Sequence, residues 1–484
     1  MTVQVVDTRR PDVLSPRERL EALCDPGTFE AIRSAATSRR MGTKARAGDG
    51  VIGGAGRVGG RPVFCYAQDP SFAGGSLGEE HADTIVRVLR LAESSGAPVV
   101  AFIESAGARL QEGLAALSGY ARVFAANVAL SGKVPQISVI NGVSAGGGSY
   151  SPALTDFVIM TGRARMFLTG PGVVRDVLGE DVDAAELGGP RVHERNGVAQ
   201  FVVPDDLAAA DLARRLLDLL PQSVHEAPAL AYPTQPAEGD PGDVVPAESR
   251  RVYDVRDVVE RLADGGELLE YGARWARNMV CAFARLDGRP VGFVCNQPRH
   301  LGGVIDADAA QKAARFIRTC NAYGLPLVVL VDTPGYMPGT AQERGGVIRH
   351  GAKLVYAFAE ATVPRVTVTL RKSFGGAHIA MNSRDLGADM TFAWPGAELG
   401  VMGARQAVGV LHRRTIEASE DPEAERDRLA EEYAGQHLDA ANAVAEGFVD
   451  EVIEPADTRA RLAWALSTFS GEGRRRERVA NIPL

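Results

Sequence analysis

Aromatic residues are scarce in this chain, at 6% of 484 residues, so its core must rest mainly on Ala, Val, Leu and Ile. The 5 cysteines are scattered, and no two have the CxxC spacing of a zinc ribbon. No apolar run is long enough to span a bilayer, and residues 1–14 lack the apolar core of a signal peptide. These absences predict a cytoplasmic protein with reduced thiols and no membrane segment.

Positive charge is also in short supply. The chain has 53 Lys and Arg against 61 Asp and Glu, a net charge of -8. This balance argues against a general nucleic-acid binder. It leaves room for a local basic pocket that binds a phosphorylated ligand.

The familiar catalytic signatures are missing. The sequence contains no GxSxG elbow, no HExxH helix and no Walker loop. Of the 8 histidines, only His193 and His378 lie near a motif. We interpret both as packing or hydrogen-bonding residues, and His378 is the better functional candidate because it adjoins a glycine cluster. No metal site is expected.

An internal repeat dominates what the sequence does contain. The run GRPV at 60–63 recurs at 288–291, and the glycine pair 74–75 recurs at 302–303, both 228 positions later. Three more matches keep this order at offsets of 228 or 229: 97–100 with 325–328, 134–135 with 363–364, and 145–148 with 374–377. A period this long predicts a duplicated domain and not a solenoid.

The repeat sets the expected domain boundaries. Residues 1–226 form the first domain, and residues 249–484 form the second. The residues between them, 227–248, are rich in Pro, Ala, Gly and Asp, which is typical of a linker.

Each copy alternates strand and helix signals. The first copy predicts strands at 97–103 and 135–140 around a helix at 113–130; the second predicts strands at 327–331 and 365–370 around a helix at 347–361. Such alternation predicts an α/β fold with layered sheets. Ligands in these folds lie beyond the carboxyl ends of the strands.

A glycine cluster follows the second strand of each copy, at 145–148 and at 374–377. Glycines at the start of a helix let neighbouring backbone N–H groups point into one cavity, where the helix dipole adds to their effect. One such donor is worth about 3 kcal/mol of transition-state stabilisation. A single cluster could merely allow tight packing, but two at matching places favour paired oxyanion holes.

Longer motifs resemble the β-type carboxyltransferase subunits of propionyl-CoA and acetyl-CoA carboxylases. The resemblance runs from about residue 18 to 454, and its motifs are GARLQEG at 107–113, SAGG at 144–147, YSPALTDF at 150–157, NQP at 296–298, KAARF at 312–316, RHGAKL at 349–354, RKSFGGA at 371–377, AWP at 393–395 and VMGA at 401–404. This family has two tandem crotonase-like (ClpP/crotonase) domains, so the resemblance implies the same α/β fold here.

The resemblance also implies the reaction. The first half would hold an acyl-CoA, and the second would receive carboxybiotin from a separate carrier protein loaded by a biotin carboxylase. The chain shows neither an ATP-grasp domain nor an Ala-Met-Lys-Met biotinyl motif, so these parts would be other polypeptides. The family works as a hexamer whose active sites combine halves of different subunits. It needs biotin and a coenzyme A thioester, but no metal, membrane or nucleic acid.

The same resemblance assigns the site residues. Gly146 and Gly147 would hold the thioester oxygen of an enolate, while Gly376 and Ala377 would hold the ureido oxygen of biotin. Further residues are expected to bind substrate: Ala106, Gly107, Arg109, Ala145, Tyr150, Phe374, Gly375, His378 and Ile379. Cations near the N-terminus are candidates for the CoA phosphates, although such a cluster is often just a solvated face: Arg39, Arg40, Lys44 and Arg46, with Arg109 beside them.

Departures from the family pattern bear on the acyl substrate. The pair His378-Ile379 stands where Tyr-Asp is usual, residues 104–107 read ESAG where Asp-Ser-Gly-Gly is common, and Thr84 stands where Lys is frequent. Isoleucine at 379 favours an acyl group longer or bulkier than acetyl; the alternative is that it fills space left by a different neighbour such as His378 and shrinks the pocket. Other interpretations stay open: the transferase subunit of a biotin-dependent decarboxylase running the reverse transfer, a catalytically dead scaffold, and an unrelated crotonase-like hydrolase or isomerase.

Overall fold

The computed structural model describes residues 13–248, 251–469 and 480–481. These residues form two compact units, 13–227 with 480–481 in the first, and 228–248 with 251–469 in the second. Of the predicted linker, 227–248, residue 227 belongs to the first unit and residues 228–248 group with the second. The polar residues 1–12 and the predicted start of the second domain at 249 lie outside the described residues.

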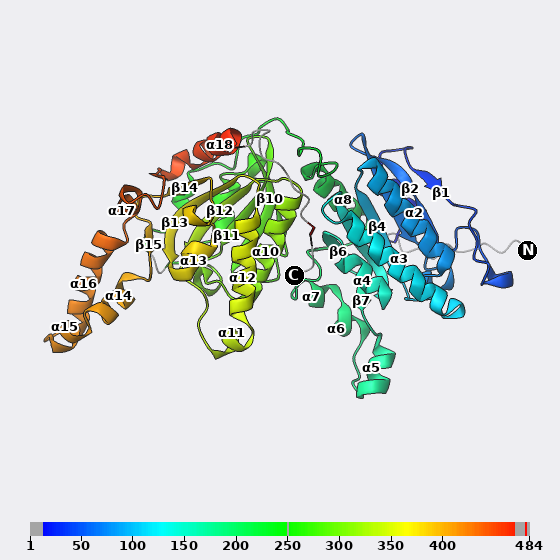
Figure 1. Cartoon of the computed structure of the whole chain (residues 1–484), viewed down its shortest axis with the longest axis horizontal. Coiled ribbons are helices and arrows are strands. Elements are labelled where there is room, and N and C mark those ends of the chain that lie inside the picture. The colour runs from blue at the N-terminus through cyan, green and yellow to red at the C-terminus, as the bar shows by residue number, and fades with distance from the viewer. Residues whose placement is uncertain (1–12, 249–250, 470–479, 482–484) are drawn as a thin grey trace, which may run out of the picture. The chain divides into compact units, whose positions relative to one another are not determined.

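The first unit is built on one eight-stranded sheet (Figure 1). Its strand order is β1-β2-β3-β4-β5-β6-β8, and β7 pairs with the far end of β5. Parallel pairing prevails from β3 onward, while β1–β2 and β2–β3 are antiparallel. The strands are β1 (Glu30–Ile32), β2 (Val51–Val58), β3 (Arg61–Gln68), β4 (Val99–Ser105), β5 (Gln136–Ala145), β6 (Phe157–Thr161), β7 (Arg165–Phe167) and β8 (Phe201–Val203).

Helices cover both faces of this sheet, because strands buried on both sides must find apolar partners on both. α2 and α3 lie side by side on one face (Figure 1). α1 packs against α8 and β3. The helices are α1 (Pro16–Leu23), α2 (Glu79–Ser95), α3 (Leu114–Leu130), α4 (Gly147–Ala153), α5 (Pro171–Leu178), α6 (Ala184–Gly188), α7 (Pro190–His193) and α8 (Asp206–Leu219), with 3-10 turns η1 (Gly42–Lys44), η2 (Ala73–Gly75) and η3 (Leu110–Glu112).

The second unit has its own eight-stranded sheet, in the order β16-β14-β13-β12-β11-β10-β9, with β15 paired to β13. The strands are β9 (Leu268–Tyr271), β10 (Met279–Leu286), β11 (Arg289–Asn296), β12 (Leu327–Thr333), β13 (Arg365–Phe374), β14 (Met390–Ala393), β15 (Glu398–Gly400) and β16 (Glu451–Val452). Counted from β9, this order matches the first sheet counted from β1, so that β9 corresponds to β1, β10 to β2, and the last strand β16 to β8.

Helices of the second unit repeat the layering. α9 and α18 share one hydrophobic cluster with the sheet, and α10 packs beside α12. The helices are α9 (Val255–Glu260), α10 (Ala307–Ala322), α11 (Thr340–Arg344), α12 (Val347–Glu360), α13 (Gly375–Ala380), α14 (Ala404–Leu411), α15 (Arg413–Ala418), α16 (Pro422–His437), α17 (Ala440–Ala445) and α18 (Thr458–Phe469), with 3-10 turns η4 (Pro241–Val244), η5 (Asp264–Gly266), η6 (Leu301–Gly303), η7 (Arg384–Leu386) and η8 (Pro455–Asp457).

Matching strand orders confirm the predicted α/β duplication. Small irregularities repeat as well: an isolated bridge joins Leu77 to Ala108 in one unit and Ile305 to Tyr336 in the other, again 228 positions apart. The connection between the first two strands differs in length. Residues 33–50 join β1 to β2, whereas only residues 272–278 join β9 to β10.

The predicted strands and helices form, but two strands run further than expected. β5 and β13 continue past a register shift to Ala145 and Phe374, where they pair with the short strands β7 and β15. The pattern missed these short strands because three residues carry too little periodicity to be recognised. Their effect is to carry each long strand right up to a glycine cluster.

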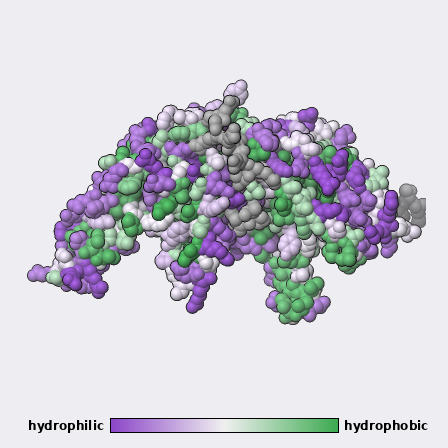
Figure 2. Space-filling view, in the orientation of Figure 1, coloured by the Kyte–Doolittle hydropathy of each residue, from purple (hydrophilic) through white to green (hydrophobic). Residues whose placement is uncertain are grey.

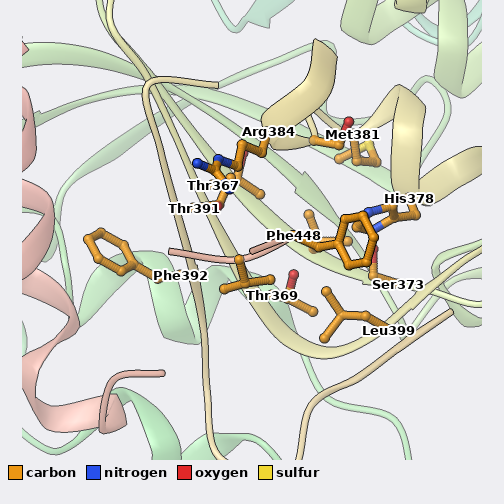
Figure 3. A pocket seen from close by; sticks show the side chains of 13 residues that line it. Thr367, Thr369, Ser373, His378, Met381, Arg384, Thr391, Phe392, Leu399 and Phe448 are labelled. Carbon is orange, nitrogen blue, oxygen red and sulfur yellow. The ribbon is translucent and has the colours of Figure 1, made fainter. Parts of the chain in front are cut away.

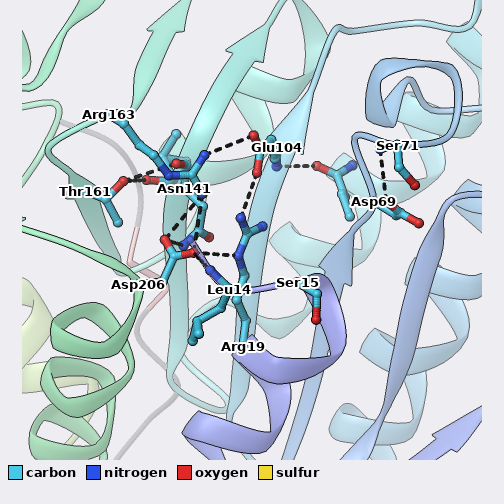
Figure 4. Close-up of polar contacts among 12 residues, drawn as sticks. Leu14, Ser15, Arg19, Asp69, Ser71, Glu104, Asn141, Thr161, Arg163 and Asp206 are labelled. Atoms are coloured by element: carbon cyan, nitrogen blue, oxygen red, sulfur yellow. Dashed lines mark hydrogen bonds and ion pairs between the residues drawn. The ribbon is translucent and has the colours of Figure 1, made fainter. Parts of the chain in front are cut away.

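A buried charge cluster ties the N-terminal helix α1 to the first sheet (Figure 4). The Asp206 carboxylate accepts from Nε of Arg19 at 3.0 Å, from Nδ2 of Asn141 at 2.8 Å and from Nη2 of Arg163 at 3.3 Å. Arg19 and Arg163 also donate to Glu104, at the end of β4. Because Arg19 and Asp206 are both buried, removing one of them would leave the charge of the other without compensation.

The second unit handles the corresponding carboxylate differently. Asp332 occupies the place of Glu104, and its Oδ2 accepts from Nε of Arg371 at 2.8 Å. Arg371 stands where the first unit has Gly142, and a Cβ on Gly142 would lie 2.1 Å from Oε1 of Glu104. In the second unit the cation is therefore Arg371, from the neighbouring strand. In the first unit that position is a glycine, and the cations are Arg19 and Arg163, which lie outside the strand.

Within residues 13–248, 251–469 and 480–481, no helix has the length and apolar content that crossing a membrane would require.

Candidate active site

The first glycine cluster turns the chain sharply from β5 into α4. Gly146 has a left-handed backbone, with φ 57°, that other residues rarely adopt. Its N–H donates to the carbonyl oxygens of Phe167 and Leu168, both at 3.1 Å. Gly146 was predicted to hold the thioester oxygen through this N–H. That assignment needs correction, because the donor is already engaged with the last residue of β7 and the residue after it.

Gly147 and Gly148 are the first residues of α4, so their N–H groups have no acceptor within the helix. Gly147 must stay a glycine, since a Cβ there would lie 2.7 Å from the ring of Tyr120. The hydroxyl of Ser149 donates to the carbonyl oxygens of Ser144 and Phe167 and fixes the turn. The two N–H groups of this turn that can donate to a ligand, those of Gly147 and Gly148, are thus one position later than predicted.

The second cluster repeats this geometry. Gly375, with φ 59°, corresponds to Gly146, and it begins the helix α13. Gly376 and Ala377 follow it, so they correspond to Gly147 and Gly148. The ring of Tyr336 lies 3.8 Å from the Cβ position of Gly376, in ordinary contact. Gly376 and Ala377 therefore stand as predicted in the first turn of a helix, and Phe374 precedes it as the N-cap residue.

Sequence reasoning missed the two tyrosines that support these turns. Tyr120 reaches Gly147 from α3, while Tyr336 reaches Gly376 from the loop after β12. They are not equivalent in the repeat, so no shared motif marks them. Burial raises the pKa of Tyr336 to about 12, and burial also raises the pKa of Tyr120. Both rings therefore act as neutral, apolar supports at neutral pH.

His378 turns inward from α13 toward a small cavity lined by hydroxyl and apolar side chains, among them Thr369 and Leu399 (Figure 3). Its Nδ1 lies 2.9 Å from the hydroxyl oxygen of Ser373. Burial lowers the pKa of His378, so the ring is neutral at pH 7. Ile379, the next residue, is instead 53% exposed on the surface beside the glycine turn.

The loop after β4 lies against the first glycine turn. The N–H of Ala106 donates to Gly74, and a Cβ on Gly107 would lie 3.2 Å from the carbonyl oxygen of Ala145. The structure thus brings together three of the predicted substrate-binding residues. Tyr150 lies on α4 itself, 53% exposed, with its ring edge-on to Phe124.

Arg109 was predicted to contact substrate, but it lies in the interior with none of its side chain exposed. Its guanidinium donates to Asp49 and Glu112, and it lies over the ring of Phe72. A phosphate cannot reach a group that is enclosed in this way. The direct-contact role is therefore corrected to one within the fold.

The other predicted cations lie on the exposed connection between β1 and β2. Arg40 pairs with Glu79 at 2.9 Å, and Arg46 pairs with Asp69 at 3.2 Å. Arg39 and Lys44 make no ion pair with any residue that the structure describes. Because exposed pairs are weak, all four cations could turn to a phosphate.

An arm follows each short strand at the glycine turns. In the first unit it begins at Leu168 and carries α5, whose exposed apolar residues form the hydrophobic lobe seen in Figure 2. Val173, Val177 and Leu178 are all more than half exposed there. In the second unit the arm begins at Val401, which is 76% exposed. Apolar surface of this kind marks a place of interaction.

Fold and turns together define a protein with two crotonase-type units, each ending a long strand at a glycine-started helix. The family model for the carboxyl transferase domain matches residues 12–478, and the chain belongs to this family. The predicted family, fold class and enzyme class are confirmed: the chain is a carboxyltransferase.

Individual relatives support the same conclusion. The chain is 47% identical to the methylmalonyl-CoA carboxyltransferase 12S subunit of Propionibacterium freudenreichii subsp. shermanii, over 94% of this chain and 88% of that protein. It is 44% identical to the propionyl-CoA carboxylase beta chain of Saccharopolyspora erythraea, over 97% and 90%. The crystal structure of transcarboxylase 12S, described as a hexamer with methylmalonyl-coenzyme A bound, matches with a TM-score of 0.93 and 46% identity over 98% of this chain and 93% of that one.

Proposed function

We propose that the chain transfers a carboxyl group from biotin on a carrier protein to the α carbon of an acyl-CoA, either propionyl-CoA or a longer one. The observation that carries the proposal is the matched pair of glycine turns, one in each unit of a carboxyl transferase family member. The relatives named for methylmalonyl-CoA and propionyl-CoA support the choice of substrate class.

In this proposal the first unit binds the acyl-CoA. The N–H groups of Gly147 and Gly148 hold the thioester oxygen while the α carbon loses its proton and the enolate forms. Backbone donors suit this task because they are already oriented toward the developing negative charge. Each is worth about 3 kcal/mol when water is excluded.

The second unit then receives the carboxylated biotin. The N–H groups of Gly376 and Ala377 hold the ureido oxygen as the bond from nitrogen to the carboxyl carbon breaks. Carboxybiotin, a substrate, supplies CO2 and a base for the α-proton of the thioester. The enolate carbon forms the new bond to CO2, so no side-chain base is required. The neutral His378, turned toward Ser373, is consistent with this.

The proposal includes an assembly. A homo-hexamer is expected, with a biotin carboxylase and a biotin carrier protein as partners, since the similar 12S structure is described as a hexamer in a multienzyme core. The exposed apolar residues of the two arms suit such contacts. A cytoplasmic location remains a prediction from the sequence.

Carboxylation of a panel of acyl-CoAs tests the function. The purified chain, combined with biotin carboxylase, carrier, ATP and labelled bicarbonate, should give labelled products from propionyl-CoA or longer substrates. Removal of the carrier should stop the reaction. If the chain instead only decarboxylates a malonyl-type CoA onto biotin, the decarboxylase interpretation is correct. If it moves carboxyl groups in neither direction with an active partner set, the scaffold interpretation is correct.

Ile379 should select the acyl group. Its exposed side chain beside the second glycine turn offers apolar contact worth about 0.8 kcal/mol per buried CH2, which is about fourfold in kcat/KM. Aspartate at this place would penalise an alkyl chain. We expect Ile379→Asp to lower kcat/KM for butyryl-CoA more than for acetyl-CoA. The measurement is kcat/KM across acyl chain lengths.

The matched control is Leu230→Asp, an equally drastic change at an exposed residue of the segment 228–248, outside both arms. It should leave the ranking of substrates as it is. The prediction fails if acetyl-CoA is already the best substrate of the native chain, or if Ile379→Asp leaves the ranking unchanged.

A further inference from the structure

A buried ion pair lies between the exposed cations and the first glycine turn. It joins Arg109 and Glu112, whose side chains are both fully enclosed, with Nη1 of Arg109 2.9 Å from Oε1 of Glu112. Both residues belong to the short turn that follows the loop after β4. The proposed reaction gives neither residue a role, so their role is sought in the segments to which they hydrogen-bond.

Arg109 holds the C-terminal end of the cationic segment, defined as residues 39–46. Its Nη1 donates to Oδ1 of Asp49 at 2.7 Å, and its Nη2 donates to the backbone oxygen of Asp49 at 3.1 Å. Nη2 also donates to the backbone oxygen of Ser76 at 2.9 Å. A planar guanidinium with its donors spread over several acceptors fixes geometry, not just charge.

Glu112 holds the other end. Its Oε1 accepts from the hydroxyl of Ser38 at 2.8 Å, and its Oε2 accepts from the N–H of Glu79 at 2.7 Å. Ser38 in turn accepts from the N–H of Arg40. Burial alone would raise the pKa of Glu112, but the hydrogen bonds from Glu79, Ser38 and Arg109 outweigh it and hold the pKa below its ordinary value. The carboxylate is therefore charged at neutral pH.

The same turn connects to the glycine cluster. Arg109 follows the loop whose Gly107 lies against the carbonyl oxygen of Ala145, and the backbone N–H of Arg109 donates to Leu77. A continuous set of buried contacts thus runs from both ends of the cationic segment to the residue that precedes Gly146.

The duplication supplies an internal comparison. At the places of Arg109 and Glu112 the second unit has Met337 and Thr340, 228 positions later. The second unit also lacks the long connection: its β9–β10 connection spans only 272–278, with Arg274 and Arg277 as its cations, against 33–50 in the first. The ion pair therefore accompanies the segment and is not a requirement of the shared fold. A buried ion pair is in any case weak evidence for stability, since apolar residues often serve as well.

We propose that Arg109 and Glu112 are positioning residues, which set the cationic segment at a fixed place relative to the first glycine turn so that it can bind the phosphates of the CoA nucleotide. The inference rests on the proposed function for the choice of ligand. It adds that the affinity for the phosphates depends on two buried residues that never touch them.

Ser38→Ala tests this with little risk to the fold. The change removes one hydrogen bond to Glu112 and leaves the pair with Arg109 intact. We expect the Kd for coenzyme A to rise about fivefold to tenfold, as the loss of one charge-assisted hydrogen bond allows. The Kd for pantetheine, which has no phosphate, should stay the same. Isothermal titration calorimetry measures both without any need for turnover.

Two further variants sharpen the result. Glu112→Gln should weaken coenzyme A binding more than Ser38→Ala does, again with pantetheine unaffected. Ser94→Ala, an exposed serine whose hydroxyl bonds only within α2, should change neither affinity. Removal of Arg39 and Lys44 should weaken coenzyme A binding directly.

The outcomes separate the inference from the proposed function. If Ser38→Ala weakens coenzyme A and pantetheine equally, or if the native chain binds both equally well, the positioning role is overturned. A chain that binds coenzyme A as expected but transfers no carboxyl group would contradict the proposed function alone, because the affinity pattern does not depend on transfer.

Discussion

Replacing Gly376 by proline should lower the rate of carboxyl transfer by about 10²–10³. Proline has no N–H, so the variant removes one of the two donors proposed to hold the biotin oxygen. The helix should tolerate the ring, because Gly376 lies in the first turn, where no N–H bonds within the helix. The Cβ position has room as well, 3.8 Å from Tyr336. Single-turnover transfer from a carboxylated carrier measures the effect.

Gly376→Ala is the matched control, because it adds a Cβ at the same place and keeps the N–H. It should retain most of the activity. Equal loss in the two variants would point to the bulk of the added atoms, and near-normal transfer by Gly376→Pro would falsify the backbone-donor mechanism. Circular dichroism shows whether each variant is folded.

Replacing Asp206 by alanine should destabilise the first unit by about 3–5 kcal/mol, the typical cost of leaving a buried charge without its partner. Arg19 loses the acceptor of its Nε, and the N–H of Leu14 loses the acceptor that anchors the start of α1 (Figure 4). Urea unfolding should then show an early transition by far-ultraviolet circular dichroism.

Tryptophan fluorescence gives this experiment a built-in reference. All 3 tryptophans, Trp275, Trp394 and Trp464, belong to the second unit, so their signal should keep its midpoint in Asp206→Ala. Asp211→Ala, an exposed change on the same helix, should shift neither signal. An unchanged dichroism midpoint in Asp206→Ala would show that the charge cluster does not stabilise the unit.

The repeat made much of the fold predictable. Paired turns at an offset of 228 or 229 identified the duplication, and buried apolar runs such as 327–331 identified the central strands. These signals work because turn chemistry and strand burial are local properties of the chain. The glycine clusters were found for the same reason, since a left-handed turn at the start of a helix needs glycine.

The donors themselves could not be assigned fully from sequence. Which N–H of the first cluster is engaged depends on β7, a strand of three residues, because its last residue Phe167 and the following Leu168 accept from Gly146. Arg109 misled for a related reason: an arginine in a motif near cations resembles a phosphate ligand, and only tertiary packing shows that its acceptors are Asp49 and Glu112. Both assignments depend on contacts between residues far apart in the sequence, and a local sequence pattern does not reveal such contacts.

Glu104 and Asp332 occupy equivalent positions but pair with cations from different places in their units, and this difference limits how far the two halves can be interchanged. A chimera that moves β12 into the place of β4 by alignment would bring in Asp332 without Arg371, and β13 moved alone would insert an arginine into the space that Gly142 leaves for Glu104. A working chimera would have to exchange both neighbouring strands together, and would also have to account for α1, which carries Arg19. The descent of both halves from one ancestor has therefore left modules that are similar in outline but no longer exchangeable piece by piece.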